Sequence, residues 1–134
     1  MKAYISVSFS KRKLVDKEIA VITETLKDLD IAPSIFVDSY KFDFSQEKQM
    51  MEQAMAEIDS CDILIAETSN KGIGIGIEVG YAKAKGKKVL YLRQAGTEHS
   101  TTVSGISDYK IIYSDTTDLK QKLSNTVEKI INNS

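Results

Sequence analysis

A glutamate that follows a series of spaced glycines is the residue of this chain best suited to chemistry. Gly72, Gly74 and Gly76 alternate with other residues, and Glu78 follows at the start of an alanine-rich segment. Alternate glycines remove side chains where a helix is expected to begin, so a ligand can approach backbone N–H groups and the positive end of the helix dipole. The pattern predicts a small anionic ligand beside a carboxylate.

The carboxylate of Glu78 suits attack on the anomeric carbon of a sugar. A glutamate beside such a gap can form a covalent glycosyl ester at an oxocarbenium-like carbon, which water then releases. An acid in a first helical turn is also stabilised by the dipole alone, by about 0.3–1 kcal/mol. The residue type therefore leaves both roles open, and the preceding glycines favour the catalytic one.

A second cluster of polar residues follows the first apolar run of the chain. It contains Ser8, Ser10, Lys11, Arg12 and Lys13. Three cations at a helix start are opposed by the dipole unless an anion offsets them, so we expect a phosphate here. A solvated basic turn with Ser10 as a helix N-cap explains the same residues.

Aromatic and acidic residues supply candidates for the remainder of the site. Phe42 and Phe44 could stack on a base, and Asp38 could accept hydrogen bonds from its edge. The same rings could instead fold back onto the core as a lid, and the acid could be a turn residue. Tyr4 could point toward the carboxylate at the end of the first strand, or belong simply to the core.

The elements that must position these residues alternate between strands and helices. The apolar patterns predict strands at 3–8, 34–37, 62–66, 88–92 and 110–113. Helices are expected at about 11–30, at 45–59 with Ser45 as the N-cap, and at 75–85, where Gly86 ends the helix. A last helix is expected around its apolar residues Leu119, Leu123, Val127 and Ile130, and residues 93–108 are expected to form a polar loop.

The predicted apolar face of the first helix consists of Leu14, Ile19, Ile22, Leu26 and Leu29, and Pro33 keeps this helix from continuing. The predicted apolar face of the second helix consists of Met51, Ala54, Met55 and Ile58. Most strands are unbroken apolar runs, which is typical of a parallel sheet covered on both faces. We expect one α/β domain over 1–134, doubly wound and flavodoxin- or Rossmann-like. Its five parallel strands should have the order 2-1-3-4-5, and its ligand crevice should lie at the carboxyl ends of strands one and three.

Composition excludes several classes of protein. The chain has 18 basic and 19 acidic residues and no basic stripe, so a nucleic-acid polymer is not an expected partner. Its single cysteine, Cys61, cannot form an internal disulfide, no apolar stretch approaches the ~20 residues that span a bilayer, and the N-terminus lacks a signal-peptide pattern. We expect a cytoplasmic protein without membrane contact, cofactor or metal, since the only histidine, His99, has no metal-ligand spacing around it.

The segments 62–67, 74–82 and 86–90 resemble the nucleoside 2-deoxyribosyltransferase superfamily. They are most similar to its hydrolytic branch, the 2'-deoxynucleoside 5'-monophosphate N-glycosidases. The resemblance implies that Glu78 is the nucleophile, that Tyr4 orients it or assists proton movement, and that Ser8 with the following loop holds the 5'-phosphate. It also implies that Ser100 completes the phosphate site of a neighbouring subunit, in at least a homodimer.

Two positions depart from the family pattern. Ala54 stands where family members usually have an aspartate that contacts the sugar or the leaving base, and Glu67, Asp43 or Glu57 are candidates to replace it. Gly72 stands where the hydrolytic branch tends to have a phosphate-binding serine, for which Ser69 or Lys71 could compensate.

The predicted function is hydrolysis of the N-glycosidic bond of a 2'-deoxynucleoside 5'-monophosphate, or a similar small nucleotide, to free base and sugar phosphate. Glu78 is the predicted nucleophile. Base exchange by a deoxyribosyltransferase is a first alternative. A non-catalytic nucleotide-binding module, or a module that resembles NAD-cleaving TIR domains, is a second.

Overall fold

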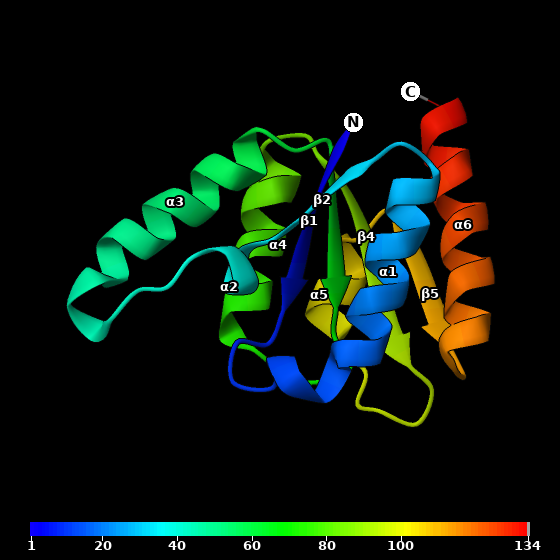
Figure 1. Cartoon of the computed structure of the whole chain (residues 1–134), viewed down its shortest axis with the longest axis horizontal. Coiled ribbons are helices and arrows are strands. Elements are labelled where there is room, and N and C mark those ends of the chain that lie inside the picture. The colour runs from blue at the N-terminus through cyan, green and yellow to red at the C-terminus, as the bar shows by residue number, and fades with distance from the viewer. Residues whose placement is uncertain (134) are drawn as a thin grey trace.

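The structure is a computed structural model that describes residues 1–133 of the chain, and its elements alternate as expected (Figure 1). Five parallel strands form one sheet in the order β2-β1-β3-β4-β5, which confirms the predicted topology. The strands are β1 (Lys2–Val7), β2 (Ala32–Ile35), β3 (Ile63–Glu67), β4 (Lys88–Gln94) and β5 (Tyr109–Tyr113). The helices are η1 (Arg12–Val15), α1 (Asp16–Asp28), α2 (Phe36–Ser39), η2 (Phe44–Gln46), α3 (Glu47–Asp59), α4 (Ile73–Ala84), α5 (Thr101–Ile106) and α6 (Thr116–Asn132).

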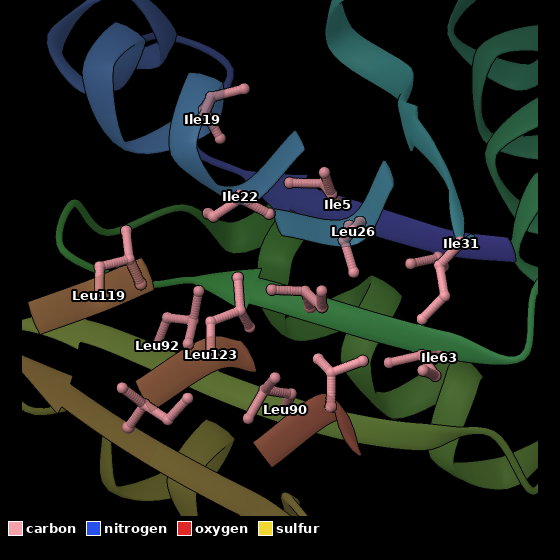
Figure 2. Close-up of a cluster of buried hydrophobic side chains, with 14 of the residues drawn as sticks. Ile5, Ile19, Ile22, Leu26, Ile31, Ile63, Leu90, Leu92, Leu119 and Leu123 are labelled. Atoms are coloured by element: carbon pink, nitrogen blue, oxygen red, sulfur yellow. The ribbon is translucent and has the colours of Figure 1, made fainter. Parts of the chain in front are cut away.

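One face of the sheet is covered by α1 and α6, which lie side by side in Figure 1. Their apolar stripes pack on side chains such as Ile5 and Leu90, as the close-up in Figure 2 shows. The α6 stripe lies as predicted, because its leucines, Val127 and Ile130 are all buried. This face forms a continuous apolar core, which stabilises the sheet by about 25 cal/mol for each Å² of apolar surface removed from water.

The other face is covered by α2, α3, α4 and α5, which contribute Phe36, Ala54, Val79 and Val103 to a second core cluster. Alternate residues of a strand point to opposite faces. On β1, Ile5 therefore joins the first cluster and Tyr4 joins the second. All five strands run in the same direction, so the loops after β1 and β3 leave from one edge of the sheet (Figure 1).

Local bounds differ from the predictions near β2. The predicted helix at 11–30 begins as the 3-10 helix η1, so Leu14 is 67% exposed and does not join the apolar face. The second strand ends at Ile35, and Val37 belongs to α2. Pro33 lies inside β2, which is an edge strand, where a residue without an N–H is tolerated.

Helix starts and ends were predicted unevenly. Asp43, not Ser45, is the cap before the second long helix: it accepts from the Ser45 backbone N–H and forms a capping box with Gln46. Gly86 ends α4 with φ +76°, as predicted. The predicted loop at 93–108 contains the short helix α5.

The remaining differences are small. The third helix begins at Ile73, two residues earlier than predicted, and Met51 and Met55 are only half-buried. Among residues 1–133, no helix is long and apolar enough to cross a membrane.

Candidate active site

The carboxylate of Glu78 is held against β1 by two hydroxyl groups. The Tyr4 hydroxyl donates to Oε2, and the Ser6 hydroxyl donates to Oε1 at 2.6 Å. The side chain is half-buried, and this burial raises the pKa of Glu78 above its ordinary value, although the two hydroxyls act in the opposite direction. Because α4 begins at Ile73, Glu78 lies in its second turn, beyond the first turn where the dipole chiefly acts. Dipole stabilisation of a first-turn acid therefore does not explain this residue.

Tyr4 combines the two roles that the sequence left open. Its side chain is 1% exposed and belongs to the second core cluster, while its hydroxyl reaches Glu78. Burial, together with the charge of Glu78, raises the pKa of Tyr4 far above that of a free phenol. The phenol therefore stays protonated and acts as a fixed donor.

Ser8 continues the row of hydroxyls that starts at Tyr4 and Ser6. Its side chain is only 2% exposed, and within residues 1–133 its hydroxyl has no hydrogen-bond partner. It lies beside the start of α4, because a Cβ built on Gly72 would be 3.4 Å from the Cα of Ser8. A hydroxyl with no protein partner next to a helix N-terminus suits an anionic ligand.

Two glycines of α4 border open space. A methyl group added to Gly74 or Gly76 would meet no atom within 4 Å. On the α5 side, a cavity of about 390 Å³ is bordered by Gly72, Gly76 and Ser100. Ser100 also caps α5, accepting from the Val103 backbone N–H, so it has a position within its own subunit.

The basic residues after β1 lie around a second hollow of about 640 Å³, whose lining includes Ser10 and Lys11. Arg12 is already paired: it donates through Nε and Nη2 to Asp38, at 3.0 and 2.8 Å, and through Nη1 to Asp16 at 2.8 Å. Neither Arg12 nor Asp38 is thus free in this state for the phosphate and base contacts predicted for them. Glu78 borders neither hollow, so the predicted crevice is divided.

The aromatic segment packs back toward the core. Phe36 stacks on Tyr4 and on Phe42, with 6.2 Å between ring centroids in each pair, and Tyr40 lies against both phenylalanines. Phe44, in contrast, is fully exposed. The structure thus brings Phe42, but not Phe44, into the group of rings that begins at Tyr4.

Glu67 is not brought to Glu78. Glu67 is 1% exposed, accepts from the Tyr113 hydroxyl at 2.6 Å and from the Ser69 backbone N–H at 2.6 Å, and faces the side of the sheet covered by α1 and α6. It follows the strand alternation that places Ala66 on the other face. This position does not suit the proton-donor role predicted for it.

Ser6 is the residue at Glu78 that was missing from the predicted site. The signal was in the sequence: Tyr4, Ser6 and Ser8 alternate along one strand and therefore share a face. In residues 1–133, no cluster of three or more histidine, cysteine, aspartate or glutamate side chains could hold a metal ion.

Comparison with known proteins decides the family. The sequence model of the nucleoside 2-deoxyribosyltransferase family matches residues 12–129. The chain belongs to this family. The resemblance noted in the sequence is thereby confirmed, and with it the prediction that the chain belongs to an enzyme family.

Individual relatives of this family member are distant. A protein of Thermofilum pendens, named a 2'-deoxynucleoside 5'-phosphate N-hydrolase, is 30% identical over 81 residues, which are 57% of this chain and 57% of that protein. The chain thus spans little more than half the length of this curated relative.

Two solved structures share the fold. The CMP N-glycosidase BcmB of Clostridium botulinum is 21% identical with a TM-score of 0.66, over 92% of this chain and 98% of that one. A 2-deoxyribosyltransferase of Bacillus psychrosaccharolyticus is 18% identical with a TM-score of 0.67, over 90% of each chain. At these identities the likeness shows the α/β fold alone.

Proposed function

We propose that this family member hydrolyses the N-glycosidic bond of a small nucleotide, such as a 2'-deoxynucleoside 5'-monophosphate, with Glu78 as the nucleophile. The observation that carries the proposal is the environment of Glu78. Its half-buried carboxylate is hydrogen-bonded to Tyr4 and Ser6, and the unpaired hydroxyl of Ser8 lies two residues beyond Ser6 on the same face of the chain. The names of the Thermofilum and Clostridium proteins point to the same reaction class.

The hydroxyls of β1 prepare the carboxylate for attack. Because Tyr4 and Ser6 donate to different oxygens, they fix the plane of the carboxylate of Glu78 and limit its rotation. A Glu78 oxygen bonds to C1' as the bond from C1' to the base breaks, and water then hydrolyses the glycosyl ester. Burial keeps the carboxylate weakly solvated and therefore reactive.

We expect the phosphate of the substrate to bind at the start of α4. Ser8 would donate its free hydroxyl, and the first backbone N–H groups of α4 would complete an anion site, with Lys11 nearby as an exposed cation. Gly72 is adjacent to this site, since a Cβ built on it would be in van der Waals contact with Ser8, at 3.4 Å from its Cα. The site would therefore prefer a nucleotide to a nucleoside.

The test is base release. The full chain is incubated with deoxyribonucleotides, ribonucleotides, the matching nucleosides and NAD, and free base is measured by chromatography. Release from monophosphates that is lost in Glu78→Ala supports the proposal. Ser8→Ala should reduce the preference for monophosphates over nucleosides by about tenfold, the effect of losing roughly one hydrogen bond to a charged group.

Other outcomes would contradict the proposal or favour a different function. Full activity of Glu78→Ala would remove the nucleophile assignment, and cleavage of NAD alone would favour the NAD-cleaving alternative. Binding of nucleotides without any release of base would indicate a non-catalytic module.

Base exchange is the second candidate, favoured by the family match and by the name of the Bacillus protein. The same glycosyl ester at Glu78 would then be attacked by a second base in place of water. Adding an isotopically labelled free base to the reaction separates the two, because a transferase incorporates label into nucleotide and a hydrolase does not.

The homodimer is proposed on the outer surface of α4. Ile73, Gly76, Ile77 and Gly80 follow the i, i+3, i+4, i+7 spacing of one helix face, and Ile73 and Ile77 are 87% and 53% exposed. A second copy that covers this face would remove the isoleucines from water and bring another Ser100 loop near the site. Light scattering should report a dimer for the chain and a monomer for Ile77→Glu; a monomeric wild type would contradict the proposal.

A further inference from the structure

Glu78 is the proposed nucleophile, and within residues 1–133 it is not accompanied by a second carboxylic acid. The side-chain hydrogen bonds of Glu78 go to the hydroxyls of Tyr4 and Ser6, and in the described part of the chain no acidic or basic side chain hydrogen-bonds or ion-pairs with it. A base that leaves as an anion has to receive a proton as the glycosidic bond breaks. Glu78 cannot supply it while acting as the nucleophile, and Tyr4 is a poor source because its pKa is raised.

The three other acids considered for this role lie elsewhere. Glu67 is sealed on the opposite face of the sheet, and Asp43 caps η2 at the exposed start of α3. Glu57 accepts from the Tyr40 hydroxyl at 2.5 Å and from Lys2 Nζ at 2.9 Å, and these contacts lower its pKa, so it stays ionised as an acceptor.

We propose that the substrate of Glu78 is a nucleoside 5'-monophosphate whose base already carries a positive charge on the ring bonded to the sugar, as in a pyridinium mononucleotide or an N7-alkylated purine mononucleotide. This inference rests on the proposed function and specifies its substrate class. Such a base departs as a neutral molecule when it takes the electron pair of the glycosidic bond. No proton donor is then required.

The electrostatics of the site favour a cation. The carboxylate of Glu78 is desolvated and has no positive partner within the described chain. A cationic ring within about 4–6 Å favours the ionised form of a carboxyl group, so the substrate itself would activate the nucleophile. A neutral base gives no such assistance.

The outer ring of the group beside Tyr4 offers a surface suited to a charged base, because Tyr4 and Phe36 are buried whereas Phe42 is half-buried. Tyr4, Phe36 and Phe42 form a stacked series that starts at the hydroxyl bonded to Glu78 and ends at the half-buried Phe42. The faces of aromatic rings attract organic cations, with about 0.5–1 kcal/mol at exposed sites and more when desolvated. The same series gives a neutral base only ordinary stacking.

The reaction balances without an acid. A Glu78 oxygen forms a bond to C1', the C1'–N bond breaks, and its electron pair neutralises the ring. Water then bonds to C1', the bond to the carboxylate breaks, and one proton is released to solvent. The sum is cationic nucleotide plus water giving neutral base, sugar phosphate and a proton.

The experiment compares nucleotides that differ only in this charge. Guanosine 5'-monophosphate and its N7-methyl derivative, and the same pair of deoxynucleotides, are given to the full chain at saturating concentration. Base release is measured as kcat, so that any effect of the methyl group on substrate binding is separated from its effect on bond cleavage. Glu78→Gln supplies the uncatalysed background for each compound.

We expect kcat for the methylated member to be at least about 10²-fold higher, because general acid catalysis, which only the unmethylated base needs, is typically worth 10²–10⁴-fold. Equal values for the two members would show that an acid reaches the leaving base, and would overturn this inference while leaving the proposed function intact. Release from neither member of either pair above the Glu78→Gln background would overturn this inference, and the further absence of base release from every nucleotide of the wider panel would overturn the proposed function.

Discussion

Two glutamates, one buried and one half-buried, lie on opposite faces of the same sheet, and each is hydrogen-bonded to a tyrosine. Glu67 accepts from Tyr113 on the face covered by α1 and α6, and Glu78 accepts from Tyr4 on the face covered by α2–α5. Burial raises the pKa of both carboxyl groups and of both phenols. In residue types and electrostatics the two pairs are close to equivalent.

The pairs differ in what surrounds the carboxylate. Glu67 is 1% exposed, and it also accepts from the Ser69 backbone N–H, which fixes the first residues after β3. Glu78 is half-buried and follows glycines that leave space for another molecule. A raised pKa therefore does not distinguish the Glu67 pair from the Glu78 pair that we propose to be catalytic, whereas access to the carboxylate does.

The largest expected difference between the pairs is the effect of removing a carboxylate on activity. Glu78→Gln should lower kcat/KM by about 10⁴-fold or more, because the nucleophile is lost. Glu67→Gln is the matched control and should retain most activity, since its side chain lies on the other face. Base release measured on both variants, each checked for folding by circular dichroism, tests this. Comparable losses of activity in two folded variants would contradict the assignment.

Removing the hydroxyl group of each tyrosine should affect stability in one pair and activity in the other. Tyr113→Phe removes a buried donor to Glu67 and should lower the free energy of unfolding by about 1–3 kcal/mol with little change in kcat. Tyr4→Phe should instead lower kcat by about 10²-fold, because it loosens the orientation of Glu78, whereas its cost in stability is reduced by the remaining Ser6 contact and by water.

Urea unfolding and steady-state kinetics on both variants provide the measurement. If Tyr113→Phe lost more activity than Tyr4→Phe, the catalytic role would have to be assigned to the Glu67–Tyr113 pair and the structural role to the Glu78–Tyr4 pair.

A smaller effect concerns pH. Attack requires ionised Glu78, whose pKa is raised by burial, so kcat/KM should rise as pH increases through that raised pKa. The Ser6 hydroxyl lowers this pKa, so Ser6→Ala should move the rising limb to higher pH and cost a few-fold in activity in mildly acidic buffer. The corresponding change on the other face, Ser69→Ala, should leave the limb in place. A limb that does not move in Ser6→Ala would separate it from the ionisation of Glu78.

The contrast between the faces also explains what the sequence could predict. Strand order and the β1–β3 location of the site follow from apolar runs and alternation, which are local signals. The face to which Glu67 points is equally local, since it follows Ala66 by one residue, but its partner Tyr113 is 46 positions away. The pairing of Arg12 with Asp38 depends likewise on how η1 and α2 meet in space.

Helix boundaries near the site were the least predictable part. Ser45 is a good N-cap by type, yet Asp43 takes the position because Gln46 completes a capping box with it. Leu14 fits the apolar period of the first helix, but the 3-10 turn of η1 changes that period and leaves it exposed. Such choices among neighbouring residues are decided by turn geometry that the residue types do not fix.

The smallest predicted effect tests why the catalytic face has glycines at all. A methyl group on Gly76 would meet no protein atom within 4 Å, and alanine is favoured over glycine in a helix by about 0.5–1 kcal/mol, so Gly76→Ala should stabilise the chain by that amount. If the glycine serves close approach by substrate or by a second copy, the same variant should lose activity or dimerisation while gaining stability. Thermal unfolding, base release and light scattering on the one variant give the answer: a more stable chain with unchanged activity and assembly would mean that the space beside α4 is not used.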